Sequence, residues 1–462
     1  MRDISKDRLP NDEDIPSNWE KIRAGDLITL EYGDGLPKRE RNSNGDIPVY
    51  GSNGITGHHN ESITEEECLI IGRKGSAGEV TKADKPCWPI DTTYYVIPPE
   101  SLNIDYLNHY LSFLRLDLLD KSTAVPSLSR DDVYEETILV PPLEEQKRIV
   151  SKIEELFTQL DSSIADLGDS TKRVELFEKS LFDAAAKGKL SRKWRSREKG
   201  LNNSKEEMQK IREEKGEFED KELLDFGLHE IPKKWTWTQI GEFADVKGGK
   251  RLPKGHTLTK KETDYPYLRV KDMEHRGVDK SELKYLEPET REEIKKYTIS
   301  SDDLFISIAG TIGKVGTIPE ELDGINLTEN AAKITDIHGF DKKYLSYVLY
   351  SSLSREQIRR YSRATNQPKL ALFRTKQVRL PRPPLEEQKY IAKKLDSIIS
   401  NIDYAGKSIE DAKSRADKLR QSILKKAFRG ELVPQKEEDS GEFNNSSEKS
   451  NETKTTTQTR LN

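Results

Sequence analysis

The chain has 462 residues with a net charge of −5, and 34% of them are charged. No apolar run approaches the roughly 18 residues of a membrane helix, and the N-terminus lacks the apolar stretch of a signal peptide, so we expect a cytoplasmic protein of two or three domains. Only two cysteines occur, Cys68 and Cys87. Two thiols cannot form a disulfide framework or a four-cysteine zinc site.

The chain carries an internal repeat. Residues 141–147 have the sequence PPLEEQK, and the same seven residues return at 383–389. The match continues without a gap for about fifty residues, so it marks a duplicated structural unit. Upstream, IPSNW at 15–19 matches IPKKW at 231–235, but the offset drifts, and the second copy gains 26 residues. Each copy is therefore predicted to be a divergent domain followed by a helix of constant length.

The divergent part of the first copy contains short β-rich runs at residues 28–30, 68–71 and 94–97, punctuated by Gly and Pro. They predict an irregular antiparallel sheet, followed by a helix over residues 106–119. Each domain is thus expected to have a mixed α/β structure.

A long amphipathic helix is predicted after each Pro-Pro pair. Apolar residues recur there in steps of three and four, acidic residues occupy the first turn, and each helix is expected to end near Gly188 or Gly430. About 45 residues make a rod of roughly 65 to 70 Å. Each apolar seam must be buried, and the other helix is the obvious partner, which makes the pair antiparallel. The predicted fold class is α+β, with two domains related by a pseudo-two-fold axis and separated by a long antiparallel two-helix coiled coil.

Two similar domains held at a fixed spacing can bind a two-part target on duplex DNA, which itself has local two-fold symmetry. Basic clusters recur in both copies, and glycine pairs beside them allow tight turns that bring backbone amides and a cation to phosphate. Polar loop residues are candidates for contacts to base edges. The predicted DNA-binding residues are Lys38, Arg39, Arg41, Ser52, Asn53, Arg73, Lys74, Ser76 and Ser127 in the first copy, and Lys250, Arg251, Lys254, Arg269, Lys271, Lys314, Asn366, Gln367 and Lys369 in the second.

The motifs together resemble the specificity subunit of type I restriction-modification systems. The resemblance rests on the repeated helix start, the segment GRKGS at 72–76, the Ile-Pro-x-x-Trp pattern at 15–19 and the helix end FRGEL at 428–432, and it covers roughly residues 15–434. It implies two target recognition domains that each bind half of a bipartite, asymmetric DNA site, and spacer helices that bind two methyltransferase subunits. It also implies that this chain binds no cofactor, and that S-adenosylmethionine, ATP and Mg²⁺ belong to the methyltransferase and restriction/translocase partners. The predicted divisions are an N-terminal arm (1–14), target recognition domain 1 (15–142), spacer helix 1 (143–190), a charged linker helical around 206–215 (191–230), target recognition domain 2 (231–384), spacer helix 2 (385–435) and a disordered tail (436–462).

Two other classes of protein are alternatives. A self-contained DNA methyltransferase or nuclease should carry a glycine-rich cofactor loop and, for amino-methylation, an Asn/Asp-Pro-Pro-aromatic motif, and neither occurs. A coiled-coil scaffold without a nucleic-acid role would not need two divergent domains with basic turns. The segment 308–314 lacks the spacing of a phosphate-binding loop, and His58-His59 has no ligand neighbours at metal-binding spacing. The sequence therefore favours a non-catalytic recognition subunit.

Overall fold

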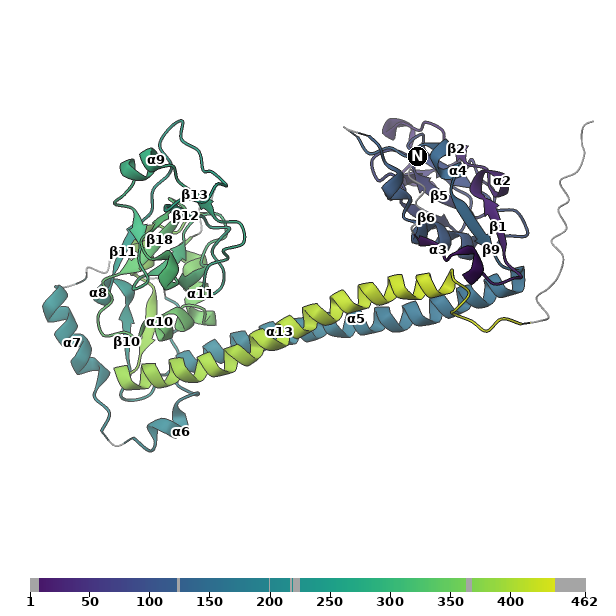
Figure 1. Cartoon of the computed structure of the whole chain (residues 1–462). Coiled ribbons are helices and arrows are strands. Elements are labelled where there is room, and N and C mark those ends of the chain that lie inside the picture. Colours follow the sequence, from purple (N-terminus) through teal and green to yellow (C-terminus); the bar gives the residue numbers. More distant parts are fainter. Residues whose placement is uncertain are drawn as a thin grey trace, which may run out of the picture. The chain divides into compact units, whose positions relative to one another are not determined.

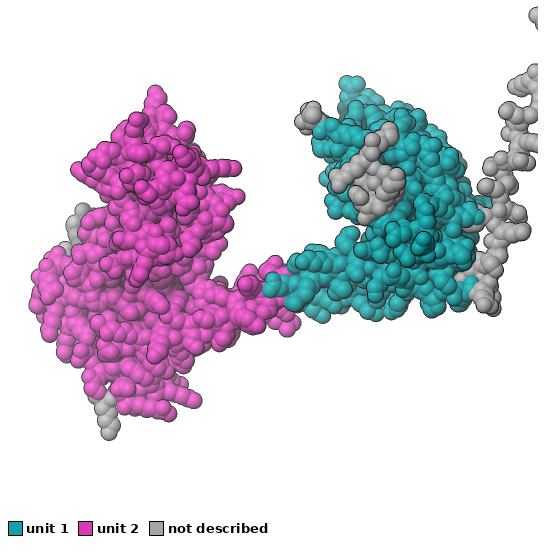
Figure 2. All heavy atoms as spheres, viewed as in Figure 1, with its two compact units in different colours: residues 1–167, 411–462 teal, residues 168–410 magenta. Residues whose placement is uncertain are grey.

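The chain divides into two compact units in the computed structural model. The structure describes residues 8–122, 125–198, 200–216, 218, 225–362 and 368–436. Unit 1 combines residues 1–167 with 411–462, and unit 2 comprises residues 168–410 (Figure 2). Each unit therefore contains one sheet-rich domain together with segments of two long helices (Figure 1).

In its described residues, unit 1 contains three sheets. Their strand orders are β1-β9, β2-β8-β5-β6 and β4-β3-β7, and all neighbours are antiparallel except β3 and β7. The strands are β1 (Glu20–Arg23), β2 (Glu31–Tyr32), β3 (Ile47–Gly51), β4 (Gly54–His59), β5 (Cys68–Gly72), β6 (Val80–Ala83), β7 (Trp88–Pro89), β8 (Thr93–Val96) and β9 (Thr137–Val140). The short helices are η1 (Asp12–Asp14), α2 (Ala24–Leu27), η2 (Lys38–Glu40), α3 (Ile104–Leu114), η3 (Leu116–Leu119) and α4 (Arg130–Tyr134).

Unit 2 repeats this plan with one additional strand among the residues that the structure describes. Its sheets have the orders β10-β19, β11-β18-β15-β16 and β13-β12-β17-β14, and the parallel pair is β12 with β17. The strands are β10 (Thr236–Gln239), β11 (Asp245–Gly248), β12 (Pro266–Leu268), β13 (Lys284–Tyr285), β14 (Thr298–Ile299), β15 (Leu304–Ser307), β16 (Val315–Thr317), β17 (Ile325–Leu327), β18 (Ala331–Thr335) and β19 (Arg379–Arg382). The helices are α6 (Arg192–Arg195), α7 (Ser204–Lys215), α8 (Ile240–Phe243), α9 (Pro288–Glu293), η4 (Glu320–Leu322), α10 (Lys342–Val348), α11 (Ser352–Tyr361) and α12 (Leu372–Lys376). Strand β14 lies in the stretch where the second copy is longer than the first.

The two long helices are α5 (Leu143–Ala186) and α13 (Leu385–Ala427). In unit 1, Ile149 near the start of α5 shares a core with Leu424 near the end of α13. In unit 2, Phe182 near the end of α5 shares a core with Leu395 near the start of α13. The helices therefore run antiparallel, which confirms the predicted fold class.

The repeated heptapeptide anchors the start of each long helix to its own domain. In unit 1 the buried carboxylate of Glu145 accepts a hydrogen bond from Trp19 Nε1 at 3.1 Å. In unit 2 the buried carboxylate of Glu387 accepts the equivalent bond from Trp235 Nε1 at 2.9 Å. A buried carboxylate is costly unless donors satisfy it, so these bonds fix the position of each tryptophan against each helix.

The glutamine that follows also bonds its own domain in each unit. Gln146 Oε1 accepts a bond from the backbone N–H of Asn103 at 2.7 Å, and Gln388 Oε1 accepts one from the backbone N–H of Asp341 at 2.9 Å. Asn103 and Asp341 are the N-cap residues of α3 and α10. Each long helix is thereby joined to the start of a domain helix, which explains why this glutamine is identical in both copies.

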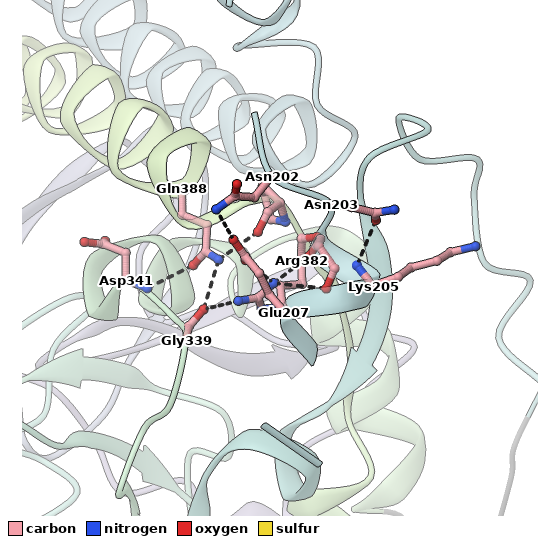
Figure 3. A network of polar contacts seen from close by, with 10 residues as sticks. Asn202, Asn203, Lys205, Glu207, Gly339, Asp341, Arg382 and Gln388 are labelled. Carbon is pink, nitrogen blue, oxygen red and sulfur yellow. Dashed lines mark hydrogen bonds and ion pairs between the residues drawn. The ribbon is translucent and has the colours of Figure 1, made fainter. Parts of the chain in front are cut away.

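The segment predicted as a charged linker is in part a packed element of unit 2. Helix α7 covers the predicted helical stretch, and it buries Met208 and Ile211 in the core of that unit. Arg382, which is 1% exposed, donates from NH1 to Ser204 Oγ at 2.7 Å and to Glu207 Oε2 at 2.9 Å (Figure 3). The charged composition concealed this docking because most other side chains of α7 face solvent.

Some predicted elements differ from the structure. Residues 28–30 do not form a strand, because Ile28 N–H bonds the carbonyl at the start of α2 and Leu30 N–H bonds a tyrosine hydroxyl of α4. The helix predicted over 106–119 is divided into α3 and η3 at Arg115, which has a φ of 60°. Apart from Lys436, the predicted tail lies outside the described residues.

Candidate nucleic-acid interface

A tight turn follows β5 in unit 1. Gly75 and Gly78 have φ values of +84° and +81°, and Gly78 N–H bonds Gly72 O at 2.8 Å. A methyl group on Gly78 would lie 2.2 Å from a backbone nitrogen of η3. Only glycine meets both the left-handed conformation and this close approach.

An equivalent turn follows β15 in unit 2. Gly310 and Gly313 have φ values of +71° and +86°, and Gly313 N–H bonds Ser307 O at 2.9 Å. In this unit Leu370 N–H bonds Ile308 O at 2.8 Å, and in unit 1 Leu128 N–H bonds Arg73 O at 2.8 Å. Both units therefore pair the turn with the same downstream segment.

Around its turn, unit 1 brings together several predicted DNA-binding residues. Lys74 forms a β-bridge with Ser127, and both residues are exposed. Ser52 Oγ lies 3.4 Å from the position of a Cβ on Gly75, which places the β3–β4 turn beside it.

Arg73 Nη1 donates to the carbonyl of Asp91 at 3.0 Å. A depression of about 460 Å³ is lined in part by Arg73, Lys74 and Ser127. Ser76 is half-buried in the turn itself, and Asn53 is exposed at the β3–β4 turn.

The first basic cluster of unit 1 lies on and beside η2. Lys38 and Arg39 are exposed, and Arg39 pairs with its neighbour Glu40 at 3.2 Å. The guanidinium of Arg41 donates to the carbonyls of Leu36 and Thr56, both at 3.0 Å. Arg41 therefore holds this loop against β4, while Lys38 and Arg39 face solvent.

Several predicted cations of unit 2 have intramolecular partners. Lys314 Nζ donates to Met273 O at 2.6 Å and to Val270 O at 3.3 Å, so its ammonium group stabilises a loop of its own domain. The other pairs are Arg251 with Glu329 at 2.8 Å, Arg269 with Asp272 at 2.5 Å and Lys271 with Glu282 at 2.5 Å.

The other described residues that were predicted in unit 2 lie in the loop after β11 and beside the turn after β15. Lys250 and Lys254 are exposed in the loop after β11, and Lys250 Nζ lies 5.5 Å from the ring centroid of Tyr297. Lys369 is exposed and forms a β-bridge with Ala309 of the turn. Asn366 and Gln367 lie outside the described residues.

Comparison with known proteins identifies the family. The family model described as "Type I restriction modification DNA specificity domain" matches residues 16–167 and 232–413, one match in each repeat. The chain belongs to this family of specificity subunits.

The EcoBI specificity subunit of Escherichia coli is 26% identical over 447 residues, which cover 91% of this chain and 88% of that protein. The MjaVIII specificity subunit of Methanocaldococcus jannaschii is 24% identical and covers 89% of this chain and 93% of its own length. A chain from a solved type I R-M system has a TM-score of 0.65 and 18% identity, and covers 91% of this chain and 100% of that chain.

The specificity subunit thus functions in DNA sequence recognition, and its two turns display different side chains. Arg73 and Lys74 of unit 1 match Ile308 and Ala309 of unit 2, whereas Lys314 matches a glutamate of unit 1. The predicted cations are therefore not equivalent in the two units, although the backbone turns are.

The specificity subunit also has a cation–π cluster around Tyr32 that the sequence pattern does not indicate. Tyr32 is 49% exposed, and the guanidinium carbons of Arg73 and Arg130 lie 5.1 and 5.2 Å from its ring centroid. Arg130 has no counterpart in the other copy, where Leu372 stands at the matching position. The repeat therefore gave no signal for this cation–π cluster.

No metal-binding geometry stands out in the parts of the specificity subunit that the structure describes. Within those residues there is no group of three or more His, Cys, Asp or Glu that could hold a metal ion. His58 and His59 lie on β4. Cys68 and Cys87 are buried with their Sγ atoms 3.8 Å apart, and the hydrogen bond from Cys68 lowers the pKa of Cys87. None of the helices in the described ranges is long and apolar enough to span a membrane.

Proposed function

We propose that the two target recognition domains each bind one half of a bipartite, asymmetric DNA site. The observation that carries this proposal is the pair of matched turns with different side chains. The same backbone conformation recurs at Gly75 and Gly310, while Arg73 and Lys74 give way to Ile308 and Ala309. Phosphate contacts position each domain and base contacts specify the sequence, so divergent side chains on a common frame suit two different half-sites.

Helices α5 and α13 act as the spacer between the half-sites and as the docking surface for two methyltransferase subunits. Their lengths of 44 and 43 residues are nearly equal, which supports a symmetric spacer. The repeated Trp19–Glu145 and Trp235–Glu387 bonds support the idea that a partner finds the same surface twice. Restriction/translocase subunits complete the complex.

The chain itself is non-catalytic and acts in the cytoplasm, where its DNA target lies. Methyl transfer from S-adenosylmethionine and cleavage driven by ATP and Mg²⁺ belong to the partner chains. The test is to assay the purified chain for methyl transfer to DNA with and without its methyltransferase partner. Transfer is expected only with the partner, and robust turnover by the chain alone would refute this part of the proposal.

The spacer role has a structural test. Seven residues that continue the apolar seam are inserted after Gly168 in α5 and after Glu410 in α13, which are equivalent positions of the repeat. Two turns add about 10 Å, or about 3 base pairs of duplex. Mapping of methylated positions should then give the original half-sites with a gap longer by about 3 base pairs. Insertion into α5 alone is the control, and it should disrupt the pairing rather than lengthen the gap. An unchanged gap in the double insertion would contradict the spacer model.

A further inference from the structure

A strongly basic turn follows the end of α5. Six cations lie within residues 187–197, and five of them have exposed side chains. This cluster, named the basic turn, consists of Lys187, Lys189, Arg192, Lys193 and Arg197. Its charge stands out because the whole chain has a net charge of −5.

Arg195 and Trp194 anchor the basic turn to helix α13. Arg195 NH1 pairs with the buried Glu387 at 2.5 Å, and its NH2 donates to Gly188 O at 3.1 Å. Trp194 stacks on Tyr390 of α13 with ring centroids 4.9 Å apart and an interplanar angle of 15°. The anchoring residues thus alternate with the exposed cations, which presents the cations from a preorganised surface.

The five cations have no acidic partner among the residues that the structure describes. None of them takes part in an ion pair there, in contrast to other surface lysines of the long helices. Lys147, Lys152 and Lys389 each pair with a glutamate three residues away, at 2.6, 2.8 and 3.0 Å. An unpaired cation can bind an external anion without first giving up a bond, so the basic turn is available for a polyanion.

The basic turn is not duplicated. The corresponding segment, residues 429–439, has the sequence RGELVPQKEED, with two cations, Arg429 and Lys436, and four acidic residues. A protein subunit that docks at both ends of the repeat would need the same charges twice. The asymmetry therefore disfavours a partner that binds in two copies, and it favours a ligand that contacts the chain here once.

We propose that the basic turn binds the phosphate backbone of duplex DNA independently of sequence. Lysine and arginine neutralise phosphate groups, and the one aromatic ring of the turn, Trp194, is already covered by Tyr390 and is not available to stack on a base. In Figure 1, α6 lies on the opposite side of α13 from the strands of unit 2. Helix α13 therefore separates α6 from the strands of unit 2. This inference rests on the proposed function only in that the chain encounters DNA.

The test is the salt dependence of binding to a 30-base-pair duplex that lacks the target sequence. The variant is Arg192→Gln, Lys193→Gln, Arg197→Gln in the full chain, and the measurement is fluorescence anisotropy at a series of salt concentrations. Each phosphate contact contributes about 0.9 to the slope of log K against log salt, so the slope should fall by about 2 to 3. At 0.1 M salt the same relation gives an affinity loss on the order of 10²-fold.

The matched control neutralises three lysines that already have acidic partners, as Lys147→Gln, Lys152→Gln, Lys389→Gln. Its slope should stay close to that of the parent chain, and both variants should keep the parent melting temperature. An unchanged slope in the basic-turn variant would overturn the inference. So would unchanged DNA affinity combined with loss of methyltransferase assembly, because that result assigns the turn to a protein partner. The duplex carries no target, so a failure to select a bipartite site would refute the proposed function without altering this measurement.

Discussion

The two helix anchors predict different sensitivities to the same substitution. Glu387 is fully buried and accepts bonds from Trp235 and from the guanidinium of Arg195, which is 21% exposed. Glu145 is equally buried, but its donors are neutral groups, namely Trp19, Asn18 and Gln435. Only the second copy therefore uses a charge pair at this position.

Glu387→Gln leaves a largely buried guanidinium without its counter-charge. Breaking a buried ion pair costs about 3 to 5 kcal/mol, and the partial exposure of Arg195 reduces this to about 2 to 4 kcal/mol. Glu145→Gln should cost only about 1 kcal/mol, because the amide oxygen still accepts a neutral donor and no cation is stranded. Hydrogen–deuterium exchange of peptides from each unit measures the opening free energy of each anchor separately.

The double variant Arg195→Gln, Glu387→Gln is the control. Removing both charges should recover at least about 1 kcal/mol relative to Glu387→Gln alone, since interacting groups show non-additive effects of that size. Equal destabilisation by Glu145→Gln and Glu387→Gln, with no recovery in the double variant, would refute the assigned role of the pair.

Three further predictions concern stability. Arg382→Val, which installs the residue of the other copy, should strand Glu207, cost about 2 to 3 kcal/mol and make α7 cleavable in limited proteolysis; intact α7 would contradict this. Gly78→Ala should destabilise unit 1 by more than 2 kcal/mol, because φ is +81° and a methyl group would meet backbone, whereas Gly75→Ala should cost about 1 kcal/mol. Exchange in unit 1 distinguishes them, and equal effects would count against the close approach. Burial works to raise the pKa of Asp303, but backbone and side-chain donors outweigh it and hold this pKa below its ordinary value. Its stabilisation of unit 2 should be complete above about pH 5 and lost as the pH falls through that lowered pKa, and Asp303→Asn should flatten this part of a pH titration of unfolding.

The repeat made the long helices predictable. Seam periodicity and the identical helix start placed α5 and α13, and the need to bury both seams predicted their antiparallel pairing. The docking of α7 was harder to predict, since Met208 and Ile211 are the only strong apolar residues in this charged helix. A spacing of three residues between them was the available signal.

The backbone turns of the candidate interface were predictable from the sequence, whereas the surroundings of their side chains were not. Glycines at equivalent positions located both turns, because a left-handed conformation restricts the residue type. The ammonium group of Lys314 donates to carbonyl groups more than forty residues earlier in the chain, at Val270 and Met273. A local pattern carries no information about such a contact, so a lysine beside a turn looks the same whether it faces phosphate or its own backbone.

The contacts of the heptapeptide explain why it can stay identical while its surroundings diverge. Its glutamate and glutamine side chains bond groups inside each domain, and Gln146 and Gln388 also donate back to the first proline carbonyl at 2.8 and 2.9 Å. The tryptophan bond and the glutamine bonds recur in both units and involve no residue of the turns. The residue just before the motif is free of them, and there Val140 and Arg382 differ completely. Since the helix start is constrained separately from the turns, the turn side chains, which we propose to face DNA, can change without loosening the anchor that positions them.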